Sequence, residues 1–229
     1  MAAALRSILI QPTAKWSRTM LTEFERYIPP DRPEKDGQVG TVVDKSQRIK
    51  VWDPLVRIFH WTVALGTIAN LTVLKHMEDP HIYVGYVMVA ALLIRLGWGF
   101  VSKGHARFSA FVPGPKALVS YGGALVARRE PRYIGHNPAG AMMMLLLMLL
   151  VAAMGATGWM MGSDQFWGEP WVEELHEVIA NIIIGAAFLH VAAAIVESIR
   201  HRENLPLSMI TGYKRAASES DIDNAPVTR

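Results

Sequence analysis

Residues 173–202, EELHEVIANIIIGAAFLHVAAAIVESIRHR, contain a long apolar run with His176 and His190 at its two ends. On an α-helix, fourteen residues fall about 40° short of four full turns, so both imidazoles lie on nearly the same face. At about 1.5 Å rise per residue they lie about 21 Å apart, most of the way across a hydrocarbon core of about 30 Å. An unsatisfied polar group in lipid costs several kcal/mol, so the run predicts a partner for each imidazole.

The composition of the whole chain indicates a small integral membrane protein. Its 229 residues are 51% hydrophobic and its mean hydropathy is positive, so no separate large soluble domain is expected. Because the chain has no cysteine, disulfides, thiolate metal sites, iron–sulfur clusters and covalent c-type haem are excluded. Metal chemistry would therefore use His, carboxylate or Met. The formal net charge is only +3, and we expect no nucleic-acid partner.

Four segments are long and apolar enough to cross a bilayer, which takes about 20 residues. They are residues 55–74, 82–101, 139–161 and 175–199. We therefore predict an all-α fold, a four-helix transmembrane bundle in contact with membrane lipid, with a short interfacial helix between the second and third spans.

The basic residues predict the orientation of these spans. Lys and Arg gather before the first span, between the second and third, and after the fourth, whereas the other two connections are acidic or nearly neutral. The positive-inside rule then places both termini in the cytoplasm. We expect a multi-pass protein of the bacterial inner (cytoplasmic) membrane.

Two further histidines match the depths of the first two. His60 lies near the cytoplasmic end of the first span, at the depth of His190, and His81 opens the second span, at the depth of His176. One pair near each membrane face suits two stacked bis-His haems, because each iron takes one imidazole on either side of its ring. The predicted metal ligands are therefore His60, His190, His81 and His176. His76, five residues before His81, is an alternative ligand.

Two other residues of the second span fit a cofactor site. Gly85 lies four residues after His81, on the same helix face, and has no side chain to keep a porphyrin away. Arg95 lies fourteen residues after His81, at the depth of the cytoplasmic pair. An arginine in a span usually has an anionic partner, here a haem propionate or a quinone headgroup. The alternative is that Arg95 extends to the cytoplasmic interface.

The remaining histidines carry weaker predictions. His136 precedes the third span and reads as a helix-start or headgroup contact, while His105 and His201 read as solvated interface residues.

Several motifs resemble the bacterial cytochrome b561 family, which includes the b-type subunits that accompany nickel–iron hydrogenases and periplasmic c-type cytochromes. They are FHW in the first span, H-x-x-x-G-Y opening the second, G-H-N-P-x-G before the third, and the histidine pair of the fourth. The resemblance covers about residues 51–215. It implies a four-helix membrane bundle with two non-covalent b haems, in which His60 with His190 holds the cytoplasmic haem and His81 with His176 the periplasmic one.

The expected organisation is thus residues 51–215 as the di-haem domain, residues 1–50 as a cytoplasmic arm and residues 216–229 as a polar tail. In the arm, Trp16, Met20, Phe24 and Ile28 recur every four residues. That pattern allows an amphipathic helix on the membrane or on a partner, with a partly ordered polar arm as the alternative.

The predicted function is transmembrane electron transfer between a quinone and a redox partner, either a periplasmic cytochrome c or a dehydrogenase or hydrogenase-type subunit. Six-coordinate haem suits outer-sphere electron transfer, so a subunit is expected rather than a stand-alone enzyme, within a homo- or hetero-oligomer. The alternatives are a stand-alone oxidoreductase that passes electrons from superoxide to quinone, a metal permease, and a membrane anchor of a larger complex.

Overall fold

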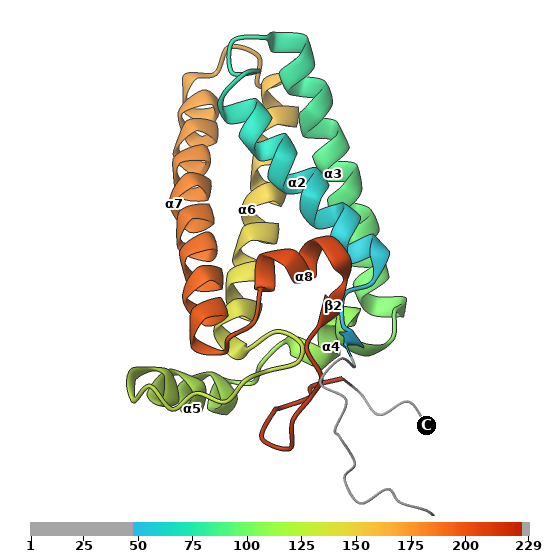
Figure 1. Ribbon diagram of the computed structural model, residues 1–229. Helices are drawn as coiled ribbons and strands as arrows, with labels where there is room; N and C mark the ends of the chain where they lie inside the picture. The colour runs from blue at the N-terminus through green and yellow to red at the C-terminus, as the bar shows by residue number, and fades with distance from the viewer. Residues whose placement is uncertain (1–47, 226–229) are drawn as a thin grey trace, which may run out of the picture. The chain divides into compact units, whose positions relative to one another are not determined.

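The computed structural model describes residues 48–225, and these are mostly helical. The predicted amphipathic arm falls outside the described residues. Four long helices dominate (Figure 1): α2 (Pro54–Leu71), α3 (Glu78–Val101), α6 (Pro138–Met161) and α7 (Pro170–Arg200). The shorter elements are β1 (Ile49–Lys50), η1 (Gly104–Ala106), α4 (Phe108–Phe111), α5 (Pro115–Val126), α8 (Leu205–Thr211) and β2 (Tyr213–Lys214).

Three of the long helices, α3, α6 and α7, have the length and hydropathy to cross a membrane. Helix α2 is present over most of the first expected span but is not among these three. It has 18 residues, and Arg57, His60 and Asn70 lower its hydropathy. A helix also occupies the connection between the second and third spans, as α5.

The helix starts follow from the local sequence. Asp53 accepts a hydrogen bond from the Val56 amide at 2.9 Å, and Asn137 accepts one from the Gly140 amide at 2.7 Å. Each cap is followed by a proline at the first position of the helix, where no amide hydrogen is needed. These signals fix where α2 and α6 begin, and hence the depth of the residues that they carry.

The long helices pack in the order α2 on α3, α3 on α6 and α6 on α7. Glycines allow two of these contacts. A Cβ added at Gly66 of α2 would lie 2.6 Å from the Met88 sulfur of α3, and one added at Gly155 of α6 would collide with Val89 of α3. Between α3 and α6, Leu92, Met148 and Val151 form a buried apolar cluster.

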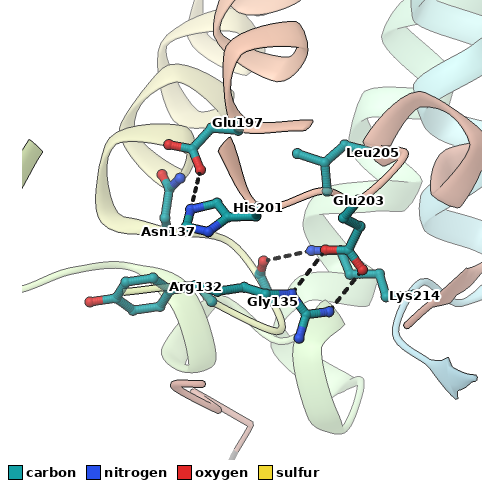
Figure 2. A pocket seen from close by; sticks show the side chains of 9 residues that line it. Arg132, Gly135, Asn137, Glu197, His201, Glu203, Leu205 and Lys214 are labelled. Carbon is teal, nitrogen blue, oxygen red and sulfur yellow. Dashed lines mark hydrogen bonds and ion pairs between the residues drawn. The ribbon is translucent and has the colours of Figure 1, made fainter. Parts of the chain in front are cut away.

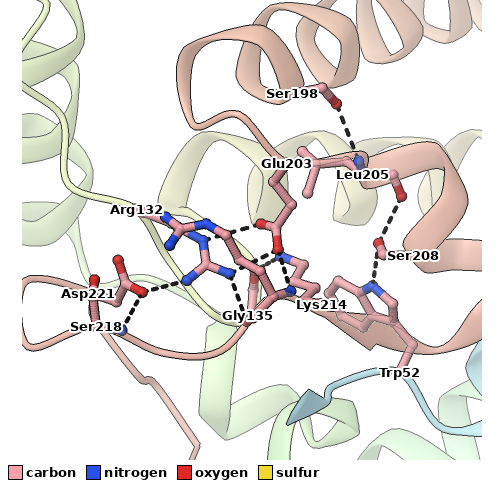
Figure 3. A network of polar contacts seen from close by, with 11 residues as sticks. Trp52, Arg132, Gly135, Ser198, Glu203, Leu205, Ser208, Lys214, Ser218 and Asp221 are labelled. Atoms are coloured by element: carbon pink, nitrogen blue, oxygen red, sulfur yellow. Dashed lines mark hydrogen bonds and ion pairs between the residues drawn. The ribbon is translucent and has the colours of Figure 1, made fainter. Parts of the chain in front are cut away.

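The chain after α7 returns to the end of the molecule where α2 begins. Strand β2 pairs antiparallel with β1, and Trp52 donates a hydrogen bond to the Ser208 hydroxyl at 3.1 Å. Beyond β2, Ile222 exchanges backbone hydrogen bonds with Arg132 and Ile134 in the connection before α6. Figure 3 shows the polar network that joins these segments around Arg132. The described part of the polar tail, residues 216–225, therefore packs against the rest of the protein.

Candidate functional site

The four predicted ligands lie in two pairs. The ring centroids of His60 on α2 and His190 on α7 are 6.4 Å apart, at an interplanar angle of 52°. Those of His81 on α3 and His176 on α7 are 6.3 Å apart, at 55°. Helix α7 thus contributes one histidine to each pair, while α2 and α3 supply the partners.

The spacing of each pair suits a shared metal ion better than direct contact. Two metal–nitrogen bonds of about 2 Å each, on opposite sides of one ion, together with the radii of the two rings, give about the observed centroid separation. The Nδ1 atoms of His60 and His81 are buried with no hydrogen-bond partner among the described residues. At Gly85, an added Cβ would meet no protein atom within 4 Å, so no protein neighbour fills that surface of α3. These residues fit a b haem between the imidazoles of each pair.

Thr157 of α6 contacts one of the predicted ligands. Its buried hydroxyl lies 3.0 Å from the Ala153 carbonyl, to which it can donate, and 2.8 Å from Nδ1 of His176. If the hydroxyl donates to Ala153, it accepts the Nδ1–H of His176, which leaves Nε2 as the free nitrogen. A hydrogen bond of this kind fixes the tautomer and ring orientation of a metal-binding histidine. The sequence carried no signal for Thr157, because the register of α6 against α7 is set by packing.

His81 and the alternative ligand, His76, lie in different surroundings. His81 lies in the first turn of α3, where the Asn70 amide of α2 donates to its carbonyl at 3.2 Å. His76 is exposed in the turn before α3. The geometry therefore favours His81 as the partner of His176.

Arg95 is buried inside the protein, with 1% of its surface exposed. One Nη donates to the Ala106 carbonyl at 3.1 Å, and the guanidinium lies 5.0 Å from the Phe108 ring centroid. The other Nη has no partner among the described residues. Arg95 is thus shielded from solvent, and it retains a free donor for an acceptor group.

A small cavity of about 50 Å³ lies at the same end of the molecule, among charged side chains (Figure 2). Arg132 makes two hydrogen bonds to the Glu203 carboxylate, at 2.8 and 3.1 Å, and a short contact to Asp221. Lys214 is 5% exposed and lies 5.2 Å from the Trp52 ring. Burial lowers the pKa of Lys214 to about 8, although the Glu203 carboxylate partly offsets this. The sequence did not reveal these buried ion pairs, since charged residues near a chain end normally lie in solvent.

The other histidines differ from their expected surroundings. His105 and His201 are half-buried rather than solvated, and they contact Asp223 at 2.8 Å and Glu197 at 3.0 Å. His136 lies between Trp52 and Phe111, with ring centroids 4.7 and 5.0 Å away. The helix start itself is made by the next residue, Asn137.

Comparison with known proteins identifies the family of the chain. The family model described as prokaryotic cytochrome b561 matches residues 51–212. A probable Ni/Fe-hydrogenase B-type cytochrome subunit of Rhodobacter capsulatus is 25% identical over 220 residues, which cover 75% of this chain and 83% of the relative. The protein of the same name from Azotobacter vinelandii is 24% identical over 226 residues, which cover 78% and 92%. No solved structure matches the chain significantly.

The matched segment contains all four paired histidines and the three helices that can cross a membrane. It extends from the residue after β1 to the glycine that ends α8. The chain therefore belongs to the prokaryotic cytochrome b561 family, as an integral membrane b-type cytochrome of electron transport.

Proposed function

We propose that the protein carries electrons across the bacterial inner membrane through two bis-His b haems, linking a quinone with a redox partner. The observation that carries this proposal is the facing of two imidazole pairs, His60 with His190 and His81 with His176, at centroid distances of 6.4 and 6.3 Å. If hydrogen bonds or ion pairs held these histidines, the two pairs would have no reason to share nearly the same centroid separation.

The residues of each centre come from different helices, which fixes their depth. His60 and His190 would hold one haem and His81 and His176 the other. When bound, a haem with two imidazole ligands supplies one-electron transfer with no open iron position. Because His176 and His190 lie on one continuous helix, α7, their depths differ by about 21 Å, most of the way across the hydrocarbon core.

The proposed topology is a four-helix transmembrane bundle with both termini in the cytoplasm. Helix α2 would be the fourth span, since it packs along α3 and brings His60 to α7. The basic residues of the connection between α3 and α6 support a cytoplasmic position for the end with α5 and α8. Helix α5 would then be the interfacial helix, and the His60–His190 pair would lie on the cytoplasmic side.

The relatives suggest the kind of partner. Both are named as cytochrome subunits of Ni/Fe-hydrogenases, so we propose a hydrogenase-type redox subunit, with a dehydrogenase or a periplasmic cytochrome c as the other options. A hetero-oligomer with that subunit would be the working form.

The test is reduction of the purified, lipid-reconstituted protein by a short-chain quinol, followed by absorption spectroscopy. The proposal predicts b-type bands that appear with quinol and disappear when an oxidised redox partner is added. A protein without b-type bands, or with bands that no quinone or quinol changes, would overturn it. Reduction by superoxide without any partner subunit would favour the stand-alone oxidoreductase.

A further inference from the structure

The buried nitrogen atoms with no hydrogen-bond partner among the described residues include Nη1 of Arg95 and Nδ1 of His136. Leaving such a donor or acceptor unpaired costs about 1–3 kcal/mol, and more for a charged group. Buried polar groups in folded proteins are nearly always satisfied, so these atoms indicate a ligand.

A row of aromatic rings connects the two side chains. Arg95 lies over Phe108, Phe108 contacts Phe111 at 5.7 Å between centroids, and Phe111 contacts His136 at 5.0 Å. Trp52 closes the other side of the His136 ring. Neither side chain can turn far without moving this row, so their free nitrogens are held in place.

The backbone around His136 is fixed as well. Lys214 donates to the Gly135 carbonyl at 3.4 Å, and Asn224 donates to the His136 carbonyl, also at 3.4 Å. A Cβ at Gly135 would lie 2.8 Å from the ring of His105, so a larger residue there would require that ring to move. Together with the Asn137 cap, these contacts preorganise the loop as a binding site would require.

The charges of Arg95 and His136 indicate which kind of ligand they would bind. Burial, followed by the charge of Lys214, lowers the pKa of His136 to about 3, so its ring is neutral and carries one N–H donor. Arg95 is cationic and forms no ion pair with any described residue. A cation and a neutral N–H together suit the acceptor oxygens of a carboxylate or a carbonyl.

An apolar cluster links the two residues to the helix segment that carries His60. Phe108, beneath Arg95, packs in the same apolar cluster as Phe59, the residue before His60. His136 connects to the same cluster through Phe111, which contacts Phe108. A cofactor bound by His60 and His190, or beside them, would therefore have its polar edge near the row of aromatic rings.

We propose that His136, together with Arg95, binds acceptor oxygens of the cofactor at the His60–His190 centre, either a propionate of that haem or a carbonyl of an adjacent quinone. The inference rests on the proposed function, since it requires haem at that centre. It assigns His136 a cofactor-binding role in place of the helix-start role expected from its position.

The test compares His136→Leu with His136→Asn in purified, haem-loaded protein, with the exposed His76→Leu as control. The midpoint potentials of both haems are measured by optical redox titration. If the ligand is a propionate, His136→Leu leaves more negative charge near one iron and lowers the potential of that haem alone. Asn places an amide near the Nδ1 position, so His136→Asn should stay close to wild type.

If the ligand is a quinone, both potentials stay unchanged and the affinity for a short-chain quinone falls about tenfold in His136→Leu, the loss expected for one hydrogen bond. Wild-type potentials together with wild-type quinone affinity would overturn the inference. Wild-type protein without b-type bands would instead refute the proposed function.

A folding defect in His136→Leu is handled by a second pair of variants. Asn places its amide near Nδ1, whereas Gln places it near Nε2. The inference requires His136→Asn to be closer to wild type than His136→Gln in potential or quinone affinity. The reverse order would contradict it.

Discussion

At the scale of single residues, Thr157 links the packing of α6 to the orientation of a predicted ligand on α7. Its hydroxyl satisfies Nδ1 of His176 inside an apolar helix pair, where an unpaired imidazole nitrogen would be costly. Gly158, the next residue, lies against the same ring: a Cβ added there would be 3.6 Å from Cε1 of His176, an ordinary contact distance.

Replacing Thr157 by Val keeps the volume and removes the hydroxyl. We expect haem at the His81–His176 centre to be held about 10–100-fold more weakly, the usual effect of losing a hydrogen bond to a ligating histidine. Haem dissociation to apomyoglobin, followed spectroscopically, measures this. Thr157→Ser retains the hydroxyl and serves as control; equal haem loss from both variants would exclude the orienting role.

Lys214 predicts a pH dependence of stability. Its pKa falls from 10.5 to about 8 on folding, so between these values the unfolded chain binds more protons than the folded protein. Stability contributed by this group therefore rises with pH from about 8 to about 10.5, and is constant below about 8. At about 1.4 kcal/mol per pKa unit, the full rise is about 3 kcal/mol.

The measurement compares thermal unfolding of wild type and Lys214→Met between pH 7 and 10 in one detergent. The difference in unfolding free energy between the two should change with pH in the predicted direction. Parallel curves over the whole range would show that Lys214 does not titrate as inferred.

The sequence predicted the residues whose role depends on depth, and it missed those whose role depends on tertiary contacts. Helical periodicity and span position were enough to group His60 with His190 and His81 with His176, and the structure brings these residues together. Whether they bind haem stays a prediction. Thr157 and Lys214 find their partners in other elements, and no periodicity within one helix encodes such contacts.

At the scale of elements, the C-terminal segment is held by a buried ionic network. Arg132 joins Glu203, which follows α7, to Asp221 in the tail, and both carboxylates are at most 5% exposed. Charged composition predicted a polar tail beyond residue 215. Paired charges can nonetheless be buried, because each neutralises the other and its hydrogen bonds replace water.

Replacing Arg132 by Leu leaves two buried carboxylates without their cation. We expect a loss of about 3–5 kcal/mol, as for other broken buried pairs, and faster proteolysis after residue 215. Arg129→Leu is the matched control, because Arg129 is an exposed arginine of the same connection. Equal stability of the two variants, by thermal unfolding, would count against the network.

The contact between α3 and α6 depends on a small residue. Gly155→Ala introduces a Cβ that collides with Val89, and overpacking of this kind costs about 1–3 kcal/mol. Gly97→Ala on α3 meets no atom within 4 Å and should be neutral or slightly stabilising. Detergent-solubilised thermal unfolding separates the two, and an unaffected Gly155→Ala would show that the helices are free to move apart.

At the scale of the whole molecule, α7 organises both candidate centres. The other long helices contact one another in sequence order, while the imidazoles of α2 and α3 both point to α7. Hydropathy predicted a helical protein with four spans, and three of the four long helices have the length and hydropathy of a span. The return of α8 and β2 to the start of α2 could not be predicted from hydropathy. Short elements carry little periodic signal, and contacts distant in sequence fix their positions.

The most direct measurement of the central claim is a pyridine haemochrome count on purified wild-type protein and the four single His→Ala variants, with His76→Ala as control. We predict about two b haems per chain in wild type and in the control. His60→Ala and His190→Ala should lack one and the same haem, identified by its potential, and His81→Ala and His176→Ala the other. A colourless wild-type protein, a single haem, or different haems lost within one pair would contradict the account.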